Sequence, residues 1–295
     1  MDIPVVSICI ISFNQAAYIR QAIDSVIAQK INFSVEIVIA DDFSSDGTRE
    51  IVFEYQQKHP EIIKVLPREK NLGPAKNFIE LMYAATGKYI AYLEGDDYWT
   101  LDTKLQQQVD FLEQHPDFVI CFTDAHETFS EDINDPRNYL SGGSGLMTET
   151  TINELIFRNY IQTCTVVFKN KLFDKFPDWY TGLKMGDWPL HLLNAAHGKI
   201  KYLPFASAVH RNHSSGVWSS QHVLDRINNT LKAYDVLAAN TDFYKLSNFN
   251  KSKSNLYLLS VKYHLKEKEF GKAAINFLKG IFIYPWHLFS IKKPV

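Results

Sequence analysis

The chain has 295 residues, of which 46% are hydrophobic and 22% charged, so its composition excludes global disorder and its length suits one large domain or a domain with an appendage. Its formal net charge of −2 gives no indication of nucleic-acid binding. The three cysteines, Cys9, Cys121 and Cys164, lack CxxC spacing, which argues against disulfides or a zinc site and favours buried thiols in a reducing compartment.

Short apolar runs alternate with helical patterns through the first 124 residues. Buried strands are expected at residues 5–11, 35–40, 62–66, 89–93 and 118–122. Helices are expected between them, with Asn14 capping the first, Ser44 or Ser45 the second, and Pro74 in the first turn of the third. This alternation predicts an α/β fold with a mostly parallel sheet covered by helices on both faces.

The regular alternation ends near residue 124. Residues 127–150 are polar and glycine-containing, which predicts a long mobile loop of the kind that often forms a lid. A strand at 161–168, a helix at 188–196 and a strand at 200–206 are expected next, and the pattern is helical from about residue 220. The chain begins with no basic segment ahead of an apolar run, and no stretch is apolar for long enough to span a bilayer, so neither a signal peptide nor a membrane span is expected.

Two of the expected strands run into acidic turns. Asp41 and Asp42 follow the strand at 35–40, and Glu94, Asp96 and Asp97 follow the strand at 89–93. Each turn alone could be a solvated turn, because Asp is a common turn residue. Two such turns at matching strand ends favour a ligand site, since open α/β sheets bind ligands at that edge. A nucleoside diphosphate with a divalent metal would explain both clusters.

Several motifs resemble those of family 2 glycosyltransferases, which have the GT-A fold. They are Ser-Ile-Cys-Ile-Ile-Ser-Phe-Asn at 7–14, residues 22–29, Glu-Ile-Val-Ile-Ala-Asp-Asp-Phe-Ser-Ser-Asp-Gly-Thr at 36–48, residues 71–77, and residues 87–97, which end in Glu-Gly-Asp-Asp. Weaker similarity at 186–190 and 210–219 is to enzymes of bacterial surface polysaccharide synthesis. The resemblance implies a GT-A domain over 1–219, with a nucleotide-sugar half at 1–124 and an acceptor half at 125–219, followed by a helical region at 220–295.

The same resemblance implies roles for residues at the matching positions. Phe13 stands where the family usually has Tyr, and Lys76 where it commonly has Arg. Asp42 would accept the N–H of a uracil or thymine base, and Mn²⁺ or Mg²⁺ is the implied cofactor. The implied nucleotide-binding residues are Ile11, Phe13, Asn14, Asp42, Lys76 and Asp96, and the implied metal ligands are Asp97 and His213. For His213, a solvated surface loop is the alternative.

Asp187 is the candidate general base. An acceptor hydroxyl must lose a proton as it attacks, and Asp187 opens a helix after a glycine, where Asp is also a common N-cap. The family match favours the base over a purely structural cap.

Together these features predict an inverting glycosyltransferase. It would transfer a sugar from a nucleoside-diphosphate donor, expected to be a UDP-sugar, to a hydroxyl of a glycan or lipid-linked acceptor. The alternatives are a sugar nucleotidyltransferase, although residues 12–17 lack the Gly-rich phosphate loop that it would need, and a non-catalytic binding module.

The C-terminal segment at 268–293 combines aromatic residues with flanking lysines. This pattern is typical of an interfacial segment on the inner face of the cytoplasmic membrane, and the alternative is a terminal helix pair packed on the protein. A cytoplasmic enzyme with peripheral membrane contact is therefore the expected arrangement.

Overall fold

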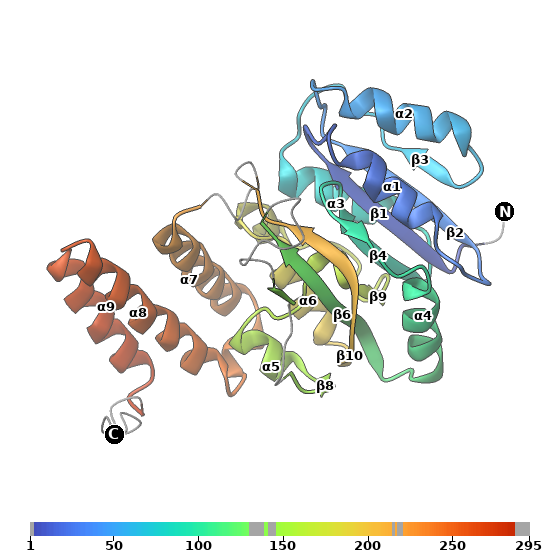
Figure 1. Cartoon of the computed structure of the whole chain (residues 1–295). Helices are drawn as coiled ribbons and strands as arrows, with labels where there is room; N and C mark the ends of the chain where they lie inside the picture. The colour runs from blue at the N-terminus through green and yellow to red at the C-terminus, as the bar shows by residue number, and fades with distance from the viewer. Residues whose placement is uncertain (1–2, 130–138, 141–145, 214–215, 217–220, 287–295) are drawn as a thin grey trace. The chain divides into compact units, whose positions relative to one another are not determined.

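The computed structural model describes residues 3–129, 139–140, 146–213, 216 and 221–286 (Figure 1). The chain divides into two compact units. The first, here called the sheet unit, comprises Met1–Thr151, Tyr160–Thr181 and Gly186–His213. The second, here called the helical unit, comprises Ile152–Asn159, Gly182–Met185 and Ser214–Val295.

The sheet unit is built on one mixed sheet with the strand order β3-β2-β1-β4-β9-β6-β10-β5. Its strands are β1 (Val6–Ser12), β2 (Val35–Asp41), β3 (Ile63–Val65), β4 (Tyr89–Glu94), β5 (Tyr98–Trp99), β6 (Phe118–Thr128), β9 (Val167–Lys169) and β10 (Lys199–Arg211), with β7 (Tyr139–Leu140) beside β6 and β8 (Glu149–Thr150) beside β10. Strands β1 to β4 pair in parallel, and β9 is antiparallel to both β4 and β6. The predicted α/β fold with a mostly parallel sheet is confirmed.

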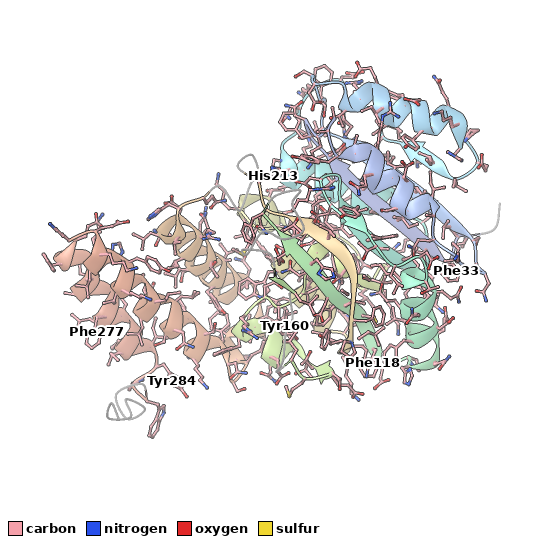
Figure 2. The ribbon with its side chains drawn as sticks, viewed as in Figure 1. Phe33, Phe118, Tyr160, His213, Phe277 and Tyr284 are labelled. Carbon is pink, nitrogen blue, oxygen red and sulfur yellow. The ribbon has the colours of Figure 1, made fainter. Side chains whose placement is uncertain are left out.

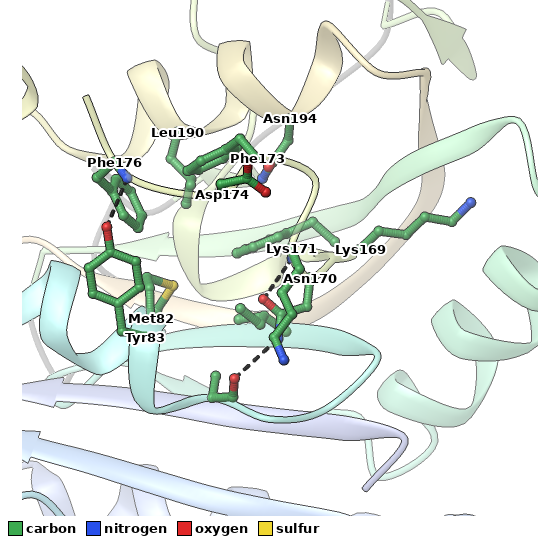
Figure 3. Close-up of a pocket in the computed structure, with 13 residues that line it drawn as sticks. Met82, Tyr83, Lys169, Asn170, Lys171, Phe173, Asp174, Phe176, Leu190 and Asn194 are labelled. Carbon is green, nitrogen blue, oxygen red and sulfur yellow. Dashed lines mark hydrogen bonds between the residues drawn. The ribbon is translucent and has the colours of Figure 1, made fainter. Parts of the chain in front are cut away.

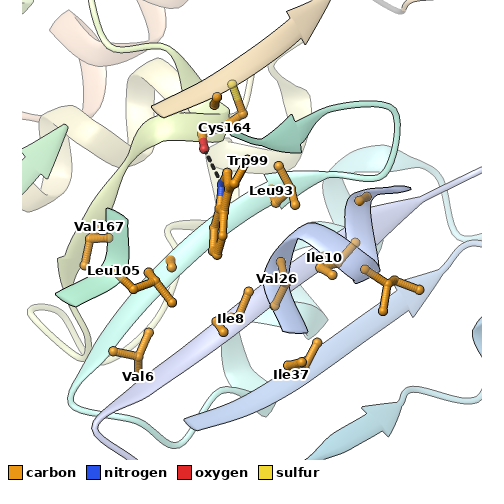
Figure 4. Close-up of a cluster of buried hydrophobic side chains, with 14 of the residues drawn as sticks. Val6, Ile8, Ile10, Val26, Ile37, Leu93, Trp99, Leu105, Cys164 and Val167 are labelled. Carbon is orange, nitrogen blue, oxygen red and sulfur yellow. Dashed lines mark hydrogen bonds between the residues drawn. The ribbon is translucent and has the colours of Figure 1, made fainter. Parts of the chain in front are cut away.

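Helices cover both faces of this sheet. They are α1 (Ile19–Ile27), α2 (Thr48–Lys58), α3 (Pro74–Ala84), α4 (Lys104–Gln114) and α6 (Asp187–Ala195). Successive side chains of a strand point to opposite faces, so Ile8 and Ile10 of β1 join Val26 of α1 and Leu105 of α4 in one core cluster (Figure 4). On the other face, the ring of Tyr92 in β4 meets Phe78 of α3.

The prediction of a long polar loop at 127–150 is partly wrong. Strand β6 continues to Thr128, and β7 and β8 lie within the same range; residues 130–138 and 141–145 lie outside the described part of the chain. The strand expected at 161–168 is also shorter than predicted, because a 3₁₀ turn at Thr163–Thr165 precedes β9. Polar side chains at the end of β6 concealed a strand whose hydrogen bonds are made with β10.

Neither of the expected N-caps is formed. Helix α1 begins after Tyr18, and the side chain of Asn14 instead accepts a hydrogen bond from the backbone N–H of Ser45. Helix α2 begins after Gly47, which has a φ of 101° that favours glycine. The prediction of local caps was wrong because the turn after β1 and the turn after β2 bond to each other.

The helical unit contains α5 (Ile152–Phe157), α7 (Val223–Asn240), α8 (Phe249–Lys266) and α9 (Phe270–Ile283). Helix α9 packs closely on α8, since Ser254 Oγ of α8 donates to the carbonyl of Gly280 at 2.7 Å. In α7, Tyr234 is buried and its hydroxyl bonds to Ser252 of α8. Among the described residues, we find no helix with both the length and the apolar character needed to cross a bilayer.

Candidate active site

The two acidic turns lie side by side at one edge of the sheet. The register pairs Ser12 of β1 with Asp41 of β2, and Ile11 of β1 with Glu94 of β4. Because these strands are parallel, their carboxyl ends meet at the same edge. The paired strands β6 and β10 also end there: Figure 2 labels Phe118 at the start of β6 and His213 just beyond the end of β10.

The turn after β1 is held by the turn after β2. Asn14 has a φ of 52°, and its backbone N–H donates to Ser44 Oγ at 2.9 Å. Its Oδ1 accepts from the backbone of Ser45 at 3.0 Å. This pairing leaves the ring of Phe13 half exposed at the edge, where it is available to stack on a flat ligand.

Asp42 organises the neighbouring loop. Its carboxylate is 4% exposed, and its two oxygens accept from the backbone N–H groups of Leu72 (2.7 Å) and Gly73 (2.9 Å). Asp42 therefore has a structural role that the sequence did not reveal, and a base contact would use the remaining lone pairs of these oxygens. Lys76 lies in the next turn, at the start of α3, and is exposed.

The turn after β4 concentrates negative charge inside the protein. Asp97 is 1% exposed; its Oδ1 accepts from the backbone N–H of Arg211 at 2.9 Å, and its Oδ2 has no hydrogen-bond partner among the described residues. Burial raises the pKa of Asp97 to about 7, with the charge of Asp96 adding to the rise and His210 opposing it. Burial, together with Asp97 and Asp96, also raises the pKa of Glu94 well above its usual range.

The end of β10 brings nitrogen-bearing side chains onto this cluster. His213 Nε2 lies 2.9 Å from Asp96 Oδ2, and Arg211 Nη1 donates to the Asp96 carbonyl at 2.6 Å. The Arg211 guanidinium lies 4.5 Å from the ring centroid of Tyr98. His213, which precedes a stretch outside the described residues, is thus next to Asp96, and its role as a metal ligand stays a prediction.

A part-buried ion pair adjoins the cluster, and the sequence patterns did not predict it. His210 Nδ1 lies 2.7 Å from Glu127 Oε2, which also accepts from Asn212 Nδ2 at 2.8 Å. Burial alone would lower the pKa of His210, but the bond to Glu127 and the charge of Asp97 raise it to about 10. Glu127 follows the same rule as the other acidic residues, a carboxylate at a strand end, and it would have been found had β6 been predicted at full length.

Asp187 is the first residue of α6, after Gly186, and is half-buried. The N-cap position of α6 is occupied by Gly186, so Asp187 is the first residue inside the helix and not the cap residue itself. The negative charge of Asp187 raises the pKa values of Glu94 and Tyr92, so it lies near the β4 end. One turn along α6, burial lowers the pKa of His191 to about 4, which keeps that ring neutral.

The residues present fit a divalent cation. Asp97 offers a buried, unpartnered carboxylate oxygen beside Asp96, and oxygen ligands are those that Mn²⁺ and Mg²⁺ prefer. Clustered buried carboxylates also need a compensating positive charge. In the helical unit, ligand atoms of His264, Glu267 and Glu269 lie within 4.8 Å of one another, but Lys272 already pairs with Glu269 there.

Comparison with known proteins identifies the family. Residues 7–179 match the family model for glycosyl transferase family 2. The chain belongs to this family, and the predicted resemblance is confirmed.

Among curated relatives, an uncharacterized protein of Mycobacterium tuberculosis, Rv1520, is 36% identical over 220 residues, which cover 73% of this chain and 61% of that protein. The chain thus spans less than two thirds of the length of this relative. A protein of Bacillus subtilis named as a teichuronic acid biosynthesis glycosyltransferase, TuaG, is 38% identical over 109 residues, covering 37% of this chain and 42% of TuaG.

Solved structures confirm the GT-A fold. The Staphylococcus aureus protein TarS, in complex with UDP-GlcNAc, superposes with a TM-score of 0.65 at 20% identity, covering 94% of this chain and 81% of that one. The mannosyltransferase PcManGT of Pyrobaculum calidifontis, in complex with GDP-Man and Mn²⁺, superposes with a TM-score of 0.63 at 15% identity, covering 100% of this chain and 82% of the other. At these identities the likeness is evidence for the fold alone.

Proposed function

We propose that this protein is a metal-dependent, inverting glycosyltransferase that moves a sugar from a UDP-sugar to a hydroxyl of a glycan or lipid-linked saccharide during synthesis of a bacterial surface polysaccharide. The observation that supports this most directly is the Glu94, Asp96 and Asp97 cluster beside the Asp42 turn, in a chain of glycosyltransferase family 2. The names of TuaG, a teichuronic acid enzyme, and of TarS bound to UDP-GlcNAc agree with this substrate class.

The donor nucleotide would lie across the carboxyl ends of β1 and β2. In this proposal Ile11, Phe13 and Asn14 surround the base, with the exposed ring of Phe13 stacked on it. Asp42 accepts the imide N–H of uracil. Exposed Lys76, at the start of α3, meets the negative charge of the diphosphate as a point charge.

The diphosphate would lie next to Asp96 and Asp97. Asp97 is the proposed main protein ligand of the metal and His213 the second. Asp96, whose Oδ2 lies 2.9 Å from His213 Nε2, would face the ribose and the metal shell. When bound, a divalent ion would offset the negative charge that develops on the departing diphosphate. Arg211 holds both Asp96 and Asp97 through its side chain and its backbone, so it fixes the shape of this turn.

Asp187 is the proposed base. The acceptor hydroxyl oxygen forms a bond to the anomeric carbon on the face opposite the diphosphate, and the bond from that carbon to the diphosphate oxygen breaks. The hydroxyl proton passes to the Asp187 carboxylate. A single displacement of this kind inverts the anomeric configuration, and general-base help contributes about 10²–10⁴-fold in rate.

A donor panel tests the function. The full chain, with and without Mn²⁺, is incubated with UDP-, dTDP-, GDP- and ADP-sugars, and nucleoside diphosphate release is measured together with competition by each free diphosphate. We expect slow hydrolysis of a UDP-sugar that requires the metal, and tighter binding of UDP than of GDP. Equal or tighter binding of GDP would contradict the role of Asp42, and pyrophosphate release from a nucleoside triphosphate with a sugar phosphate would indicate a nucleotidyltransferase instead.

A further inference from the structure

A pocket lies in the sheet unit, away from the acidic cluster (Figure 3). It has a volume of about 240 Å³ and is bounded by Ile90 near the start of β4, by Lys169 at the end of β9, and by parts of α3 and α6. Since β9 runs antiparallel to β4, with Lys169 opposite Tyr89, this pocket adjoins the amino end of β4. Glu94 and the proposed donor site lie at the carboxyl end of the same strand, so the pocket is separate from that site.

The walls of the pocket are mainly apolar and aromatic. The apolar lining includes Met82 of α3, Phe168 of β9, Leu190 of α6 and Phe173, which lies in the segment after β9. Phe173 meets Phe176 edge to face, with ring centroids 5.2 Å apart. Ligand sites commonly have such walls with a few polar groups among them.

One polar group of the pocket is buried and unsatisfied. Asn194 of α6 is 2% exposed, and its Nδ2 has no hydrogen-bond partner among the described residues. In Figure 3 its side chain extends from α6 toward Phe173 and Asp174. The other amide, Asn170, is fully used: its Nδ2 donates to the carbonyls of Ala85 and Gly87, and its Oδ1 accepts from the backbone of Lys171.

The unused donor and the charges of the lining select the chemistry of a ligand. A purely apolar ligand would leave Asn194 Nδ2 unpaired, and a buried unpaired donor is unfavourable. Asp174 and Lys171, both exposed lining residues with opposite charges, would each repel a ligand of their own sign. The third charged lining residue, Lys169, uses its Nζ to donate to the carbonyl of Pro116 at 2.6 Å. A neutral molecule with hydroxyl groups and one apolar face satisfies all of these groups.

We propose that this pocket binds one neutral saccharide ring, as a second site that performs no chemistry. A ring hydroxyl oxygen accepts from Asn194 Nδ2, another hydroxyl donates to the Asp174 carboxylate, and the apolar face of the ring packs on Phe173. The volume of about 240 Å³ lies below the ~300–1,000 Å³ that is usual for drug-sized ligands, which suits a single ring rather than a longer chain. Such a site would hold a glycan to the protein independently of the donor site, and it does not rest on the proposed function.

The methionines allow a site-specific test. The chain has four, and Met82 lines the pocket, whereas Met185 lies two residues before Asp187. The full chain with ¹³C-methyl methionine is titrated with methyl glycosides of glucose, galactose, mannose and N-acetylglucosamine, and each signal is assigned by a Met→Leu substitution. We expect at least one glycoside to shift the Met82 signal saturably, with a dissociation constant on the order of 1 mM.

Two variants separate binding from folding. Asn194→Leu should weaken the Met82 response at least about tenfold without lowering the melting temperature, because it replaces an unpaired buried donor with an apolar group. Phe173→Ala, a change in a half-buried residue, should weaken it similarly. Asp187→Asn is the control, and the Met82 response should survive in it.

Three results would overturn the second site. They are the absence of any Met82 shift with all four glycosides, an unchanged affinity in both pocket variants, and a shift confined to Met185. A protein that binds UDP with Mn²⁺ but shows no Met82 response would keep the proposed function and lose only this site.

Discussion

Asp97 differs from an ordinary acidic turn residue in one respect. An exposed turn carboxylate is solvated, whereas the Asp97 carboxylate is buried, with one oxygen bonded to the backbone of Arg211 and the other without a partner among the described residues. A buried unpaired carboxylate oxygen is unfavourable by about 1–3 kcal/mol or more. Such an arrangement is expected where a bound cation completes the site.

Replacing Asp97 with Asn should weaken the metal-dependent binding of UDP. The amide keeps the size of the side chain and loses its charge, so we expect affinity for UDP in the presence of Mn²⁺ to fall at least about tenfold, equivalent to ~1.4 kcal/mol. Calorimetry with and without Mn²⁺ measures this. Asp110→Asn, a change in an exposed residue of α4, is the matched control. An unchanged metal-dependent affinity in the Asp97 variant would show that Asp97 is not the main ligand.

Asp187→Asn should strongly slow transfer and leave donor binding intact. An interaction used mainly in the transition state affects kcat rather than affinity. We expect a loss of at least about 10²-fold in transfer rate, normal binding of UDP and a melting temperature near that of the parent.

The control for Asp187 is Asp225→Asn, because Asp225 is an exposed residue in the first turn of α7 and shares only the effect of a charge near a helix start. Asp225→Asn should leave the transfer rate unchanged. If Asp187→Asn remained active and only melted earlier, the residue would have a structural role and the base would have to be sought elsewhere, with Glu127 as the next carboxylate.

Individual helices place unusual side chains in the core. Helix α4 buries Lys104 and Gln108 completely. Lys104 Nζ lies 4.2 Å from the ring centroid of Trp99 and has no hydrogen-bond partner among the described residues. Burial lowers the pKa of Lys104 to about 7.

Lys104→Met should therefore stabilise the protein in a pH-dependent way. Between pH 7 and about 10 the unfolded chain keeps the Lys104 proton and the folded protein releases it, so the stability of the parent rises with pH in this window. The variant lacks this contribution. The excess of its unfolding free energy over that of the parent should be largest below pH 7. Above pH 7 this excess should shrink by up to ~1.4 kcal/mol per pH unit.

Urea unfolding at several pH values measures this difference, and Lys30→Met, a change in an exposed residue paired with Asp102, is the control. The control should show no comparable dependence on pH. A Lys104→Met advantage that stays constant from pH 7 to 10 would mean that the ammonium remains charged against the Trp99 ring.

Sequence patterns predicted the elements whose stability comes from apolar burial. Strands β1, β2 and β4 and helix α6 were found because their apolar runs are continuous or periodic. The far end of β6 was missed because its polar residues are satisfied at long range: Tyr202 donates to Asp124 Oδ2 at 2.6 Å, and His210 pairs with Glu127. The candidate site divides in the same way. Strand-end position predicted Asp42, Asp96 and Asp97, whereas the contact between Glu127 and His210 depended on the pairing of β6 with β10.

At the scale of the whole molecule, the open question from the sequence was whether the C-terminal segment packs on the protein or contacts a membrane. In the helical unit, α9 uses one face to pack on α8, where Ala273 and Gly280 are buried. Its other face exposes apolar side chains: Ile275 is 54%, Leu278 66% and Phe282 88% exposed. Residues 287–295, the rest of the predicted segment, lie outside the described part of the chain. The packing of α9 on α8 therefore leaves an apolar face of α9 exposed, where an interface could form.

We expect this face to bind anionic membranes without spanning them. The three apolar side chains recur at positions i, i+3 and i+7 of α9, and Lys272 and Lys279 are on the same helix, a combination that suits an interfacial helix on an anionic surface. In liposome flotation the full chain should rise with vesicles that contain anionic lipid, and added salt should weaken this binding because it screens the lysines.

A triple variant, with Ile275, Leu278 and Phe282 each changed to Gln, should lose most of the flotation while α9 stays packed on α8 through its other face. Tyr244→Gln, a change in an exposed aromatic residue elsewhere in the helical unit, is the control and should float like the parent. If the triple variant floated equally well, α9 would not be the membrane contact. If it left flotation unchanged but altered the elution volume of the protein on size exclusion, the exposed face would instead join copies of this chain.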